Sequence, residues 1–216
     1  MTEPDVTLTD YALVLECVIF AMLLRRGGAA TDGLRSWFVL FFVSVSIASL
    51  FGGTVHGFFL DEQSLGQAIL WPATLMATGV TALSAWAIGA KLLFSNRVAR
   101  WVIVAATVQF VCYSAAIIFW SQEFRIAIVN SVPAMLFLFT AIAQAYRREK
   151  HSSLLLGAGG LAPTLIGGLG QQLQVGIHPV YFNHNAVYHV LQAVALFLVF
   201  VAGRRLVGAE RDRTGK

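Results

Sequence analysis

The sequence predicts an all-α protein, a seven-transmembrane helix bundle, from its composition, its long apolar segments and the placement of its charges. Of its 216 residues, 57% are hydrophobic and 12% are charged, a balance that excludes an ordinary soluble domain. Seven apolar segments are long enough to cross a bilayer. They lie at about 10–26, 36–60, 66–93, 98–120, 124–146, 153–177 and 184–206. The length favours one integral membrane domain over residues 1–216.

Three of these segments need a separate justification. The first follows an acidic, polar stretch without a basic region or a cleavage site, so we expect a retained span and not a removed signal peptide. The third contains Pro72, and the sixth is rich in glycine between residues 157 and 170. Both remain candidate spans, because proline and glycine are common in membrane helices and small residues allow close packing.

The loop charges predict the orientation. Every lysine and arginine except Arg125 falls in the loops after the first, third and fifth segments or in the C-terminal tail. The acids Glu3, Asp5 and Asp10 fall on the other side, with Asp10 at the start of the first span. By the positive-inside rule, we expect the N-terminus outside and the C-terminus in the cytoplasm, at the plasma (inner) membrane if the protein is bacterial.

Other function classes find little support in the sequence. The formal charge of +4 is explained by the basic loops, and no phosphate-binding loop or nucleic-acid-binding motif is visible, so we expect no nucleic-acid partner. Cys17 and Cys112 lie in apolar segments without CxxC spacing and are expected to be buried thiols. The expected partner is the lipid bilayer, with a lipid as the candidate substrate.

Polar residues gather in the outer half of the predicted bundle. His56 lies roughly 6 Å inside the outer end of the second span, at a rise of 1.5 Å per residue. On the same rise, His189 lies roughly 8 Å below the start of the last span and Glu16 roughly 9 Å below Asp10. Ionisable groups at membrane depth are rare and usually face a bundle interior with partners. Further polar residues of the outer half are His184, Asn185, Tyr188, Gln171, Gln174 and Asp61.

This cluster is compatible with a metal site. Imidazole is the commonest metal ligand, and three protein ligands plus an open water position make a hydrolytic zinc site. His56, His189 and His184 are the candidate ligands, and Glu16 is the candidate acid/base or charge-balancing group. Bound zinc would lower the pKa of its water toward neutrality, and the carboxylate could then shuttle the proton. Each residue also has a purely structural interpretation, as a hydrogen-bonded contact between helices or an interfacial anchor.

A histidine at the end of the second span and a histidine-bearing motif that opens the last one resemble the CREST superfamily, which includes the alkaline ceramidases and the progestin/adipoQ receptors. The family pattern is Ser-x3-His, a later Asp, and His-x3-His. His56 and His189 match two of its zinc histidines, whereas Gly52 stands at the serine position and Asn185 at the other histidine. No acid lies within the third span, so Asp61 and Glu62 are the loose candidates for the Asp. The resemblance implies a zinc-dependent hydrolase acting on a lipid amide or ester.

Two alternatives stay open at this point. His56 and His189, on two different spans, would suffice as axial ligands of a b-type haem. A non-enzymatic transporter, receptor or small-molecule-binding bundle is the other alternative, in which the glycine-rich sixth span unwinds to line a cavity.

Overall fold

The computed structural model describes the backbone of residues 1–26, 33–174, 176–178 and 182–214, and the side chains in these ranges outside 163–172 and 210–214. The described residues form seven helices and one isolated antiparallel bridge, between His178 and Phe182. The predicted all-helical class is confirmed. The helices are α1 (Pro4–Arg25), α2 (Gly33–Phe58), α3 (Leu65–Leu93), α4 (Asn96–Phe119), α5 (Phe124–Glu149), α6 (Ser152–Gln172) and α7 (His184–Thr214).

Within the described residues, six helices are long and apolar enough to cross a membrane: α1 to α5, and α7 over His184–Ala209. In α6, the apolar stretch with described side chains is Ser152–Ala162. The chain is therefore a multi-pass membrane protein. The helices extend beyond several predicted bounds, since α1 begins at Pro4 instead of residue 10 and α7 continues to Thr214. Proline at the start of α1 explains the early beginning, because its fixed φ suits a first helical turn and its missing N–H is not needed there.

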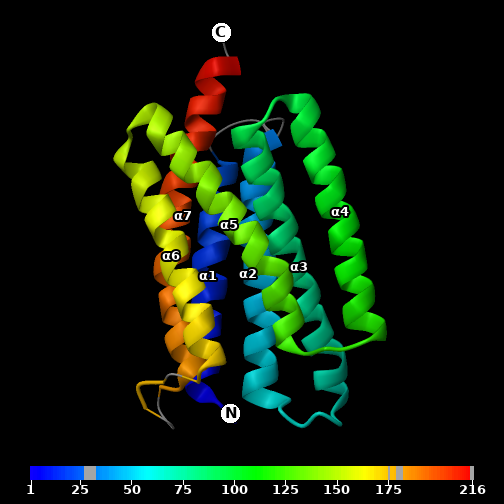
Figure 1. The fold of residues 1–216 in the computed structure, drawn as a ribbon. Helices are drawn as coiled ribbons and strands as arrows, with labels where there is room; N and C mark the ends of the chain where they lie inside the picture. Colours follow the sequence, from blue (N-terminus) through cyan, green and yellow to red (C-terminus); the bar gives the residue numbers. More distant parts are fainter. Residues whose placement is uncertain (27–32, 175, 179–181, 215–216) are drawn as a thin grey trace.

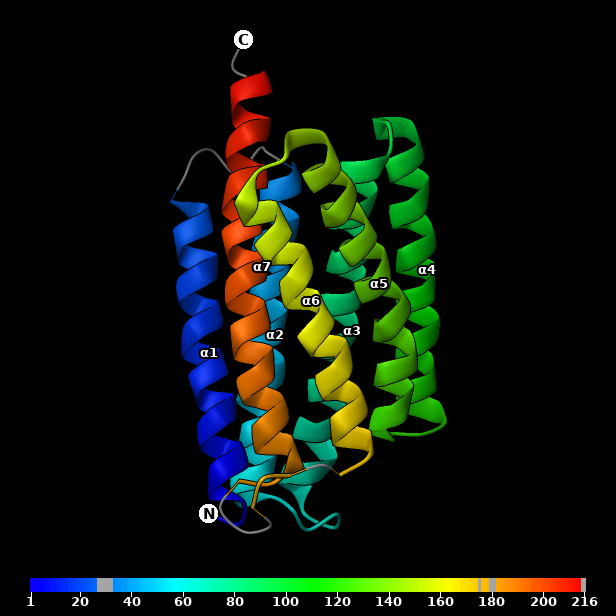
Figure 2. The same cartoon turned by 60° about the vertical axis from the view of Figure 1, so that its left-hand side comes forward.

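The helices run alternately up and down, as Figure 1 and Figure 2 show. We call the end that carries the N-terminus and the α2–α3 and α4–α5 connections the N-end, and the opposite end, with the C-terminus, the C-end. α1 packs against α2 and α7, while α3 packs against α2, α4 and α5. α6 packs against α7 and α5. α4 stands at the periphery beside α3 (Figure 2).

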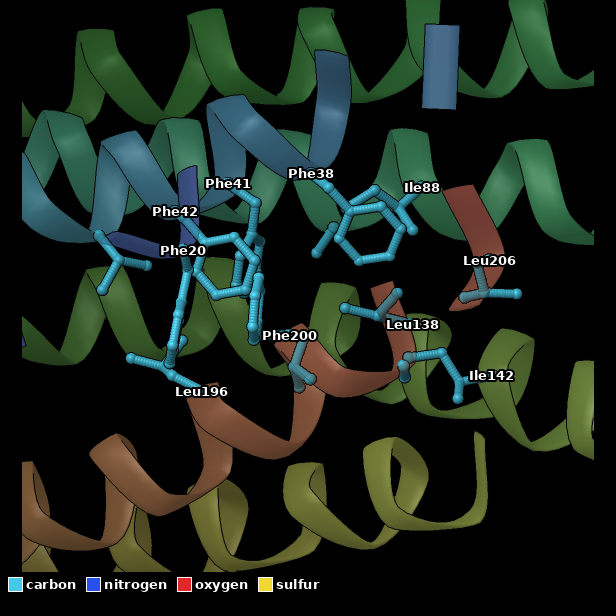
Figure 3. Close-up of a cluster of buried hydrophobic side chains, with 14 of the residues drawn as sticks. Phe20, Phe38, Phe41, Phe42, Ile88, Leu138, Ile142, Leu196, Phe200 and Leu206 are labelled. Carbon is cyan, nitrogen blue, oxygen red and sulfur yellow. The ribbon is translucent and has the colours of Figure 1, made fainter. Parts of the chain in front are cut away.

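Phenylalanines fill the middle of the bundle (Figure 3). The Phe20 ring of α1 stacks on Phe200 of α7, with centroids 4.2 Å apart, and meets Phe42 of α2 edge-on at 5.5 Å. Phe42 has no exposed surface, and Phe38 is equally buried one turn along α2. Aromatic pairs of this kind contribute about 0.5–1.5 kcal/mol each beyond the area they bury. They join α1, α2 and α7, the three helices that carry the polar site described below.

Two glycines on α2 allow α1 to approach closely near the N-end. A Cβ placed on Gly53 would lie 2.7 Å from Asp10 Cβ, and one on Gly57 would lie 2.9 Å from Thr7 Oγ1. Any side chain at either position would therefore push the helices apart. Their spacing of four residues is the small-xxx-small pattern of closely packed membrane helices. The close contact brings Asp10 against α2.

Candidate functional site

The most deeply buried acid–imidazole contact of the described chain joins α1 to α7. His189 Nε2 lies 3.6 Å from Asp10 Oδ1, and the two side chains are 12% and 6% exposed. His189 Nδ1 lies 3.1 Å from Thr9 Oγ1. Ser49 on α2 hydrogen-bonds to the Asp10 carboxyl. Three helices thus contribute to one small polar cluster, which we call the Asp10–His189 site (Asp10, His189, Thr9 and Ser49).

The hydrogen bonds of Thr9 orient the imidazole. The single hydrogen of the Thr9 hydroxyl is shared between the backbone carbonyls of Asp5 and Val6, whose oxygens each lie 2.9 Å from Oγ1. Because the hydroxyl hydrogen is directed at those carbonyls, its oxygen is left to accept from Nδ1–H of His189. A neutral imidazole then presents its unprotonated Nε2 to Asp10. This arrangement can accept a proton at Nε2 and deliver one from the carboxyl.

The start of α7 is fixed on α1 by a second contact. Asn183 Oδ1 caps α7 by accepting from the backbone N–H groups of Asn185 and Ala186, at 2.9 and 3.1 Å. The backbone N–H of Asn183 in turn donates to Asp5 Oδ2 at 3.0 Å. Asn183 therefore caps α7 with its side chain and binds Asp5 of α1 with its backbone N–H. These two contacts fix the first turns of α7 relative to α1. That register sets the position of His189.

A second acid–imidazole pair lies at the N-end. His56 Nδ1 lies 2.5 Å from Glu3 Oε2, with side chains 20% and 31% exposed. The backbone N–H groups of Thr2 and Glu3 donate to the carbonyls of Gly57 and His56, which ties the N-terminus to the end of α2. The rings of His56 and Trp71 of α3 are nearly perpendicular, with their centroids 6.5 Å apart. We call these residues the Glu3–His56 pair; it is more exposed than the Asp10–His189 site.

The structure brings together only part of the predicted set. His189 is central, the Tyr188 ring has its centroid 5.9 Å from that of His189, and His56 is paired with Glu3. Glu16 lies further along α1, half-buried, and its Oε2 has no hydrogen-bond partner among the described residues. Asp61 is exposed and accepts from the backbone N–H of Gln63.

The remaining predicted residues lie around the start of α7 and the end of α6. His184 is the first residue of α7, and it is partly exposed, like Asn185. Gln174 is exposed, with a left-handed φ of 55°. The side chain of Gln171 lies outside the described residues.

The carboxyl group of the site was missed from the sequence. Asp10 was placed at the surface because the first span was expected to begin there, whereas it lies six residues inside α1 and is 4% exposed. The signal that could have found it is local: Pro4 followed by Asp5 is a typical helix start. Thr9 and Ser49 carried no signal of their own, since hydroxyls in membrane helices usually bond within their own helix.

The fit to a metal is incomplete. Within the described residues, no three His, Cys, Asp or Glu side chains are grouped so that they could hold one ion. His56 and His189 each use Nδ1 within the chain, on Glu3 and Thr9 respectively. The zinc and haem hypotheses therefore stay predictions.

The fold and the site define a multi-pass helical membrane protein with a buried acid–imidazole site near one end of its bundle. The chain belongs to a family described as a family of unknown function, DUF6962, which it matches over residues 6–207. That range includes Asp10, Ser49, His56 and His189. No curated protein and no solved structure matches the chain.

Proposed function

We propose that this protein is a membrane-embedded hydrolase that cleaves a lipid amide or ester at the Asp10–His189 site. The observation that carries the proposal is the orientation of His189, whose Nδ1 is held by Thr9 while Nε2 faces Asp10. A buried imidazole with one nitrogen oriented by a partner and the other next to an acid is the arrangement used in general acid–base catalysis. Burying ionisable side chains at membrane depth is costly, so their presence supports a functional role.

In the proposed reaction, water attacks the carbonyl carbon of the lipid amide or ester. Nε2 of His189 takes the proton of the attacking water, and the Asp10 carboxyl gives its proton to the leaving nitrogen or oxygen as the C–N or C–O bond breaks. The products are a carboxylic acid and an amine or alcohol, and the proton returns from His189 to Asp10. Ser49 and Thr9 position the two groups, and acid–base catalysis of this kind contributes about 10²–10⁴-fold to a rate.

Relationship to the CREST superfamily and use of zinc are finer parts of this proposal. They rest on His56 and His189, which stand at the matching positions. Asp10 takes the place that the sequence suggested for Glu16 or Asp61 as the nearby carboxyl. A zinc dependence would show as activity that is lost on chelation and restored by Zn²⁺, together with stoichiometric zinc in metal analysis of the purified chain.

We further propose that the N-end faces the outside. Apart from Arg125, the basic residues of the described helices lie toward the C-end, as Arg100 near the start of α4 and Arg147 near the end of α5 illustrate, and the positive-inside rule places such residues in the cytoplasm. An outward N-end would admit lipids of the outer leaflet. Cysteine placed at Gln63, in the α2–α3 connection, should react with an impermeant maleimide on intact cells, whereas cysteine at Ser95 should not.

A second candidate function is proton-dependent binding or transport. It is favoured by the Glu3–His56 pair, a second acid–imidazole contact that lies nearer the N-end than the Asp10–His189 site. Chains of acids and histidines in a membrane often relay protons. Uptake into proteoliposomes that depends on a pH gradient, without any lipid product, would favour this candidate.

The test of the hydrolase is an assay of purified protein in nanodiscs against lipid amides and esters of different head groups, with mass-spectrometric detection of the released fatty acid. Asp10→Asn and His189→Gln should lower the rate about 10²–10⁴-fold. The matched control is Glu16→Gln, which neutralises an acid on the same helix and should leave the rate unchanged. Equal losses in Asp10→Asn and Glu16→Gln would contradict the assignment of Asp10, and absence of product from every lipid would overturn the hydrolase.

A further inference from the structure

A polar pocket opens at the C-end, far from the Asp10–His189 site. It has a volume of about 150 Å³ and lies between α2, α3, α5 and α7. A cavity needs roughly 10–15 Å³ to hold one water, so this space could accept a small chemical group together with several waters. Its walls combine the apolar side chains of Leu34 and Leu206 with the charged Lys91, Arg148 and Glu149.

The described residues that line this pocket carry a net positive charge. Glu149 Oε2 lies 3.4 Å from Arg205 Nη2, so the one carboxylate of this described lining already has a cationic partner. Among the described residues, the ion pairs involve neither Lys91 nor Arg148. Within the part of the chain that the structure describes, these two cations therefore line the pocket without a carboxylate of their own.

The start of α2 adds to this positive potential. The Lys91 ammonium lies so close to Gly33, the first residue of α2, that a Cβ there would be 2.7 Å from Nζ. The first N–H groups of a helix carry partial positive charge and attract anions. A lysine seated at this end of a helix places like charges together, and an anion between them would stabilise both.

We propose that the C-end pocket binds the phosphate group of an anionic ligand. Arginine matches the tetrahedral oxygens of phosphate through its planar fork of donors, and lysine binds them as a point charge. Basic pockets between membrane helices are typical sites for acidic lipid head groups. The source of the phosphate is an anionic phospholipid or a water-soluble phosphate compound, which share this chemistry. This inference does not depend on the proposed hydrolase.

The test measures binding of dihexanoyl phosphatidylglycerol and dihexanoyl phosphatidylcholine to the purified full chain in detergent by native mass spectrometry. Phosphatidylglycerol should bind the wild type at one molecule per chain, and phosphatidylcholine should not compete. Lys91→Gln and Arg148→Gln should each weaken binding about fivefold and the double variant roughly thirtyfold. The matched control is Arg97→Gln with Arg100→Gln, which removes the same charge from exposed positions at the start of α4 and should change binding less than twofold.

A second arm adds inorganic phosphate as the competitor. Displacement of phosphatidylglycerol by millimolar phosphate, or binding of phosphate alone that Lys91→Gln weakens, identifies a soluble phosphate compound as the ligand; binding that phosphate does not disturb identifies a lipid. Arg148→Glu reverses the charge at an exposed position and should abolish binding. It tests the proposal even if Lys91→Gln unfolds the chain. Equal effects in the pocket and control variants, or no binding of either probe, would overturn the proposal.

Discussion

The two ends of the bundle hold their charges in different ways. At the C-end, Arg35 is buried, but other long basic side chains are exposed and two of them lie over aromatic rings: Lys150 Nζ is 5.5 Å from the centre of Tyr146, and the Arg204 guanidinium is 5.9 Å from that of Phe200. At the N-end, acids and imidazoles meet each other across α1, α2 and α7, and the Asp10–His189 contact is almost fully buried. Exposed basic groups cost little desolvation free energy, because the charged head stays hydrated while the aliphatic part of the side chain packs on apolar surface.

Buried acids and imidazoles require compensation. Removing a carboxylate and an imidazole from water costs several kcal/mol per ion unless hydrogen bonds or proton sharing offset it. The chain supplies that compensation with Ser49 and Thr9. The buried acid–imidazole contact is therefore held at the N-end in spite of its cost, which supports a functional role there. Four substitutions test the difference between the two ends.

The largest expected effect lies between the two ends. Phe42→Ala removes a ring with no exposed surface that contacts Phe20, Phe41 and Phe200. The cavity should lower the free energy of unfolding by about 3–5 kcal/mol. Detergent-denaturant titration followed by circular dichroism measures this loss. A loss below about 1 kcal/mol would show that the phenylalanine cluster does not hold α1, α2 and α7 together.

The next effect tests the close approach that brings Asp10 to α2. Gly53→Ala places a Cβ 2.7 Å from Asp10 Cβ, so the backbones must separate and stability should fall by about 1–3 kcal/mol. Gly159→Ala is the matched control, because a Cβ there meets nothing within 4 Å. Since alanine is the better helix former, the control should be neutral or up to about 1 kcal/mol more stable. Equal outcomes for the two variants would contradict the close packing of α1 on α2.

A smaller effect distinguishes the two acid–imidazole pairs. Glu3→Gln removes the charge from the more exposed pair and should lower stability by about 1 kcal/mol or less, with a dependence on salt. Thermal unfolding at low and high ionic strength measures it. A loss of several kcal/mol that salt does not change would show that the Glu3–His56 pair stabilises the fold as a buried pair does, and would contradict the difference between the two pairs.

The smallest effect is expected at the exposed N-end pair of Arg125 with Glu123. These residues are two positions apart, and their side chains are largely exposed. Arg125→Gln should therefore change stability by less than about 0.5 kcal/mol. Because Arg125 is the one basic residue of the predicted outer side, the same variant also tests the orientation, which it should leave unchanged in the cysteine-labelling assay.

The sequence was sufficient for the class of fold because hydropathy and loop charge are properties of single segments. Long apolar runs had to become helices, and the basic residues had to lie near the ends of those helices, as Arg100 does near the start of α4. The same reasoning found His56 and His189, since a histidine inside an apolar run is visible without any partner. The seven apolar segments correspond to the seven helices, six of which meet the length and hydropathy required of a span.

The partners of those histidines depend on contacts between helices, which hydropathy does not encode. Whether His189 meets Glu16 or Asp10 is decided by the rotation of α1 and by its first residue. An error of six residues at the start of α1 turned the buried Asp10 into an expected surface acid. Gly53 was visible in the sequence, but only the structure shows that the missing side chain accommodates Asp10 and Tyr11. Partner choice in the site could therefore not be predicted.

We propose that Asp10 and His189 act as one unit in the hydrolysis of a lipid, and a double-mutant cycle would decide this. Hydrolysis rates in nanodiscs would be measured for the wild type, Asp10→Asn, His189→Gln and the double variant, each verified as folded by its unfolding midpoint. Residues that act as a unit are strongly non-additive, so the double variant should be within about twofold of either single one. Effects that multiply, or a single variant with wild-type activity, would show that the two residues do not act together.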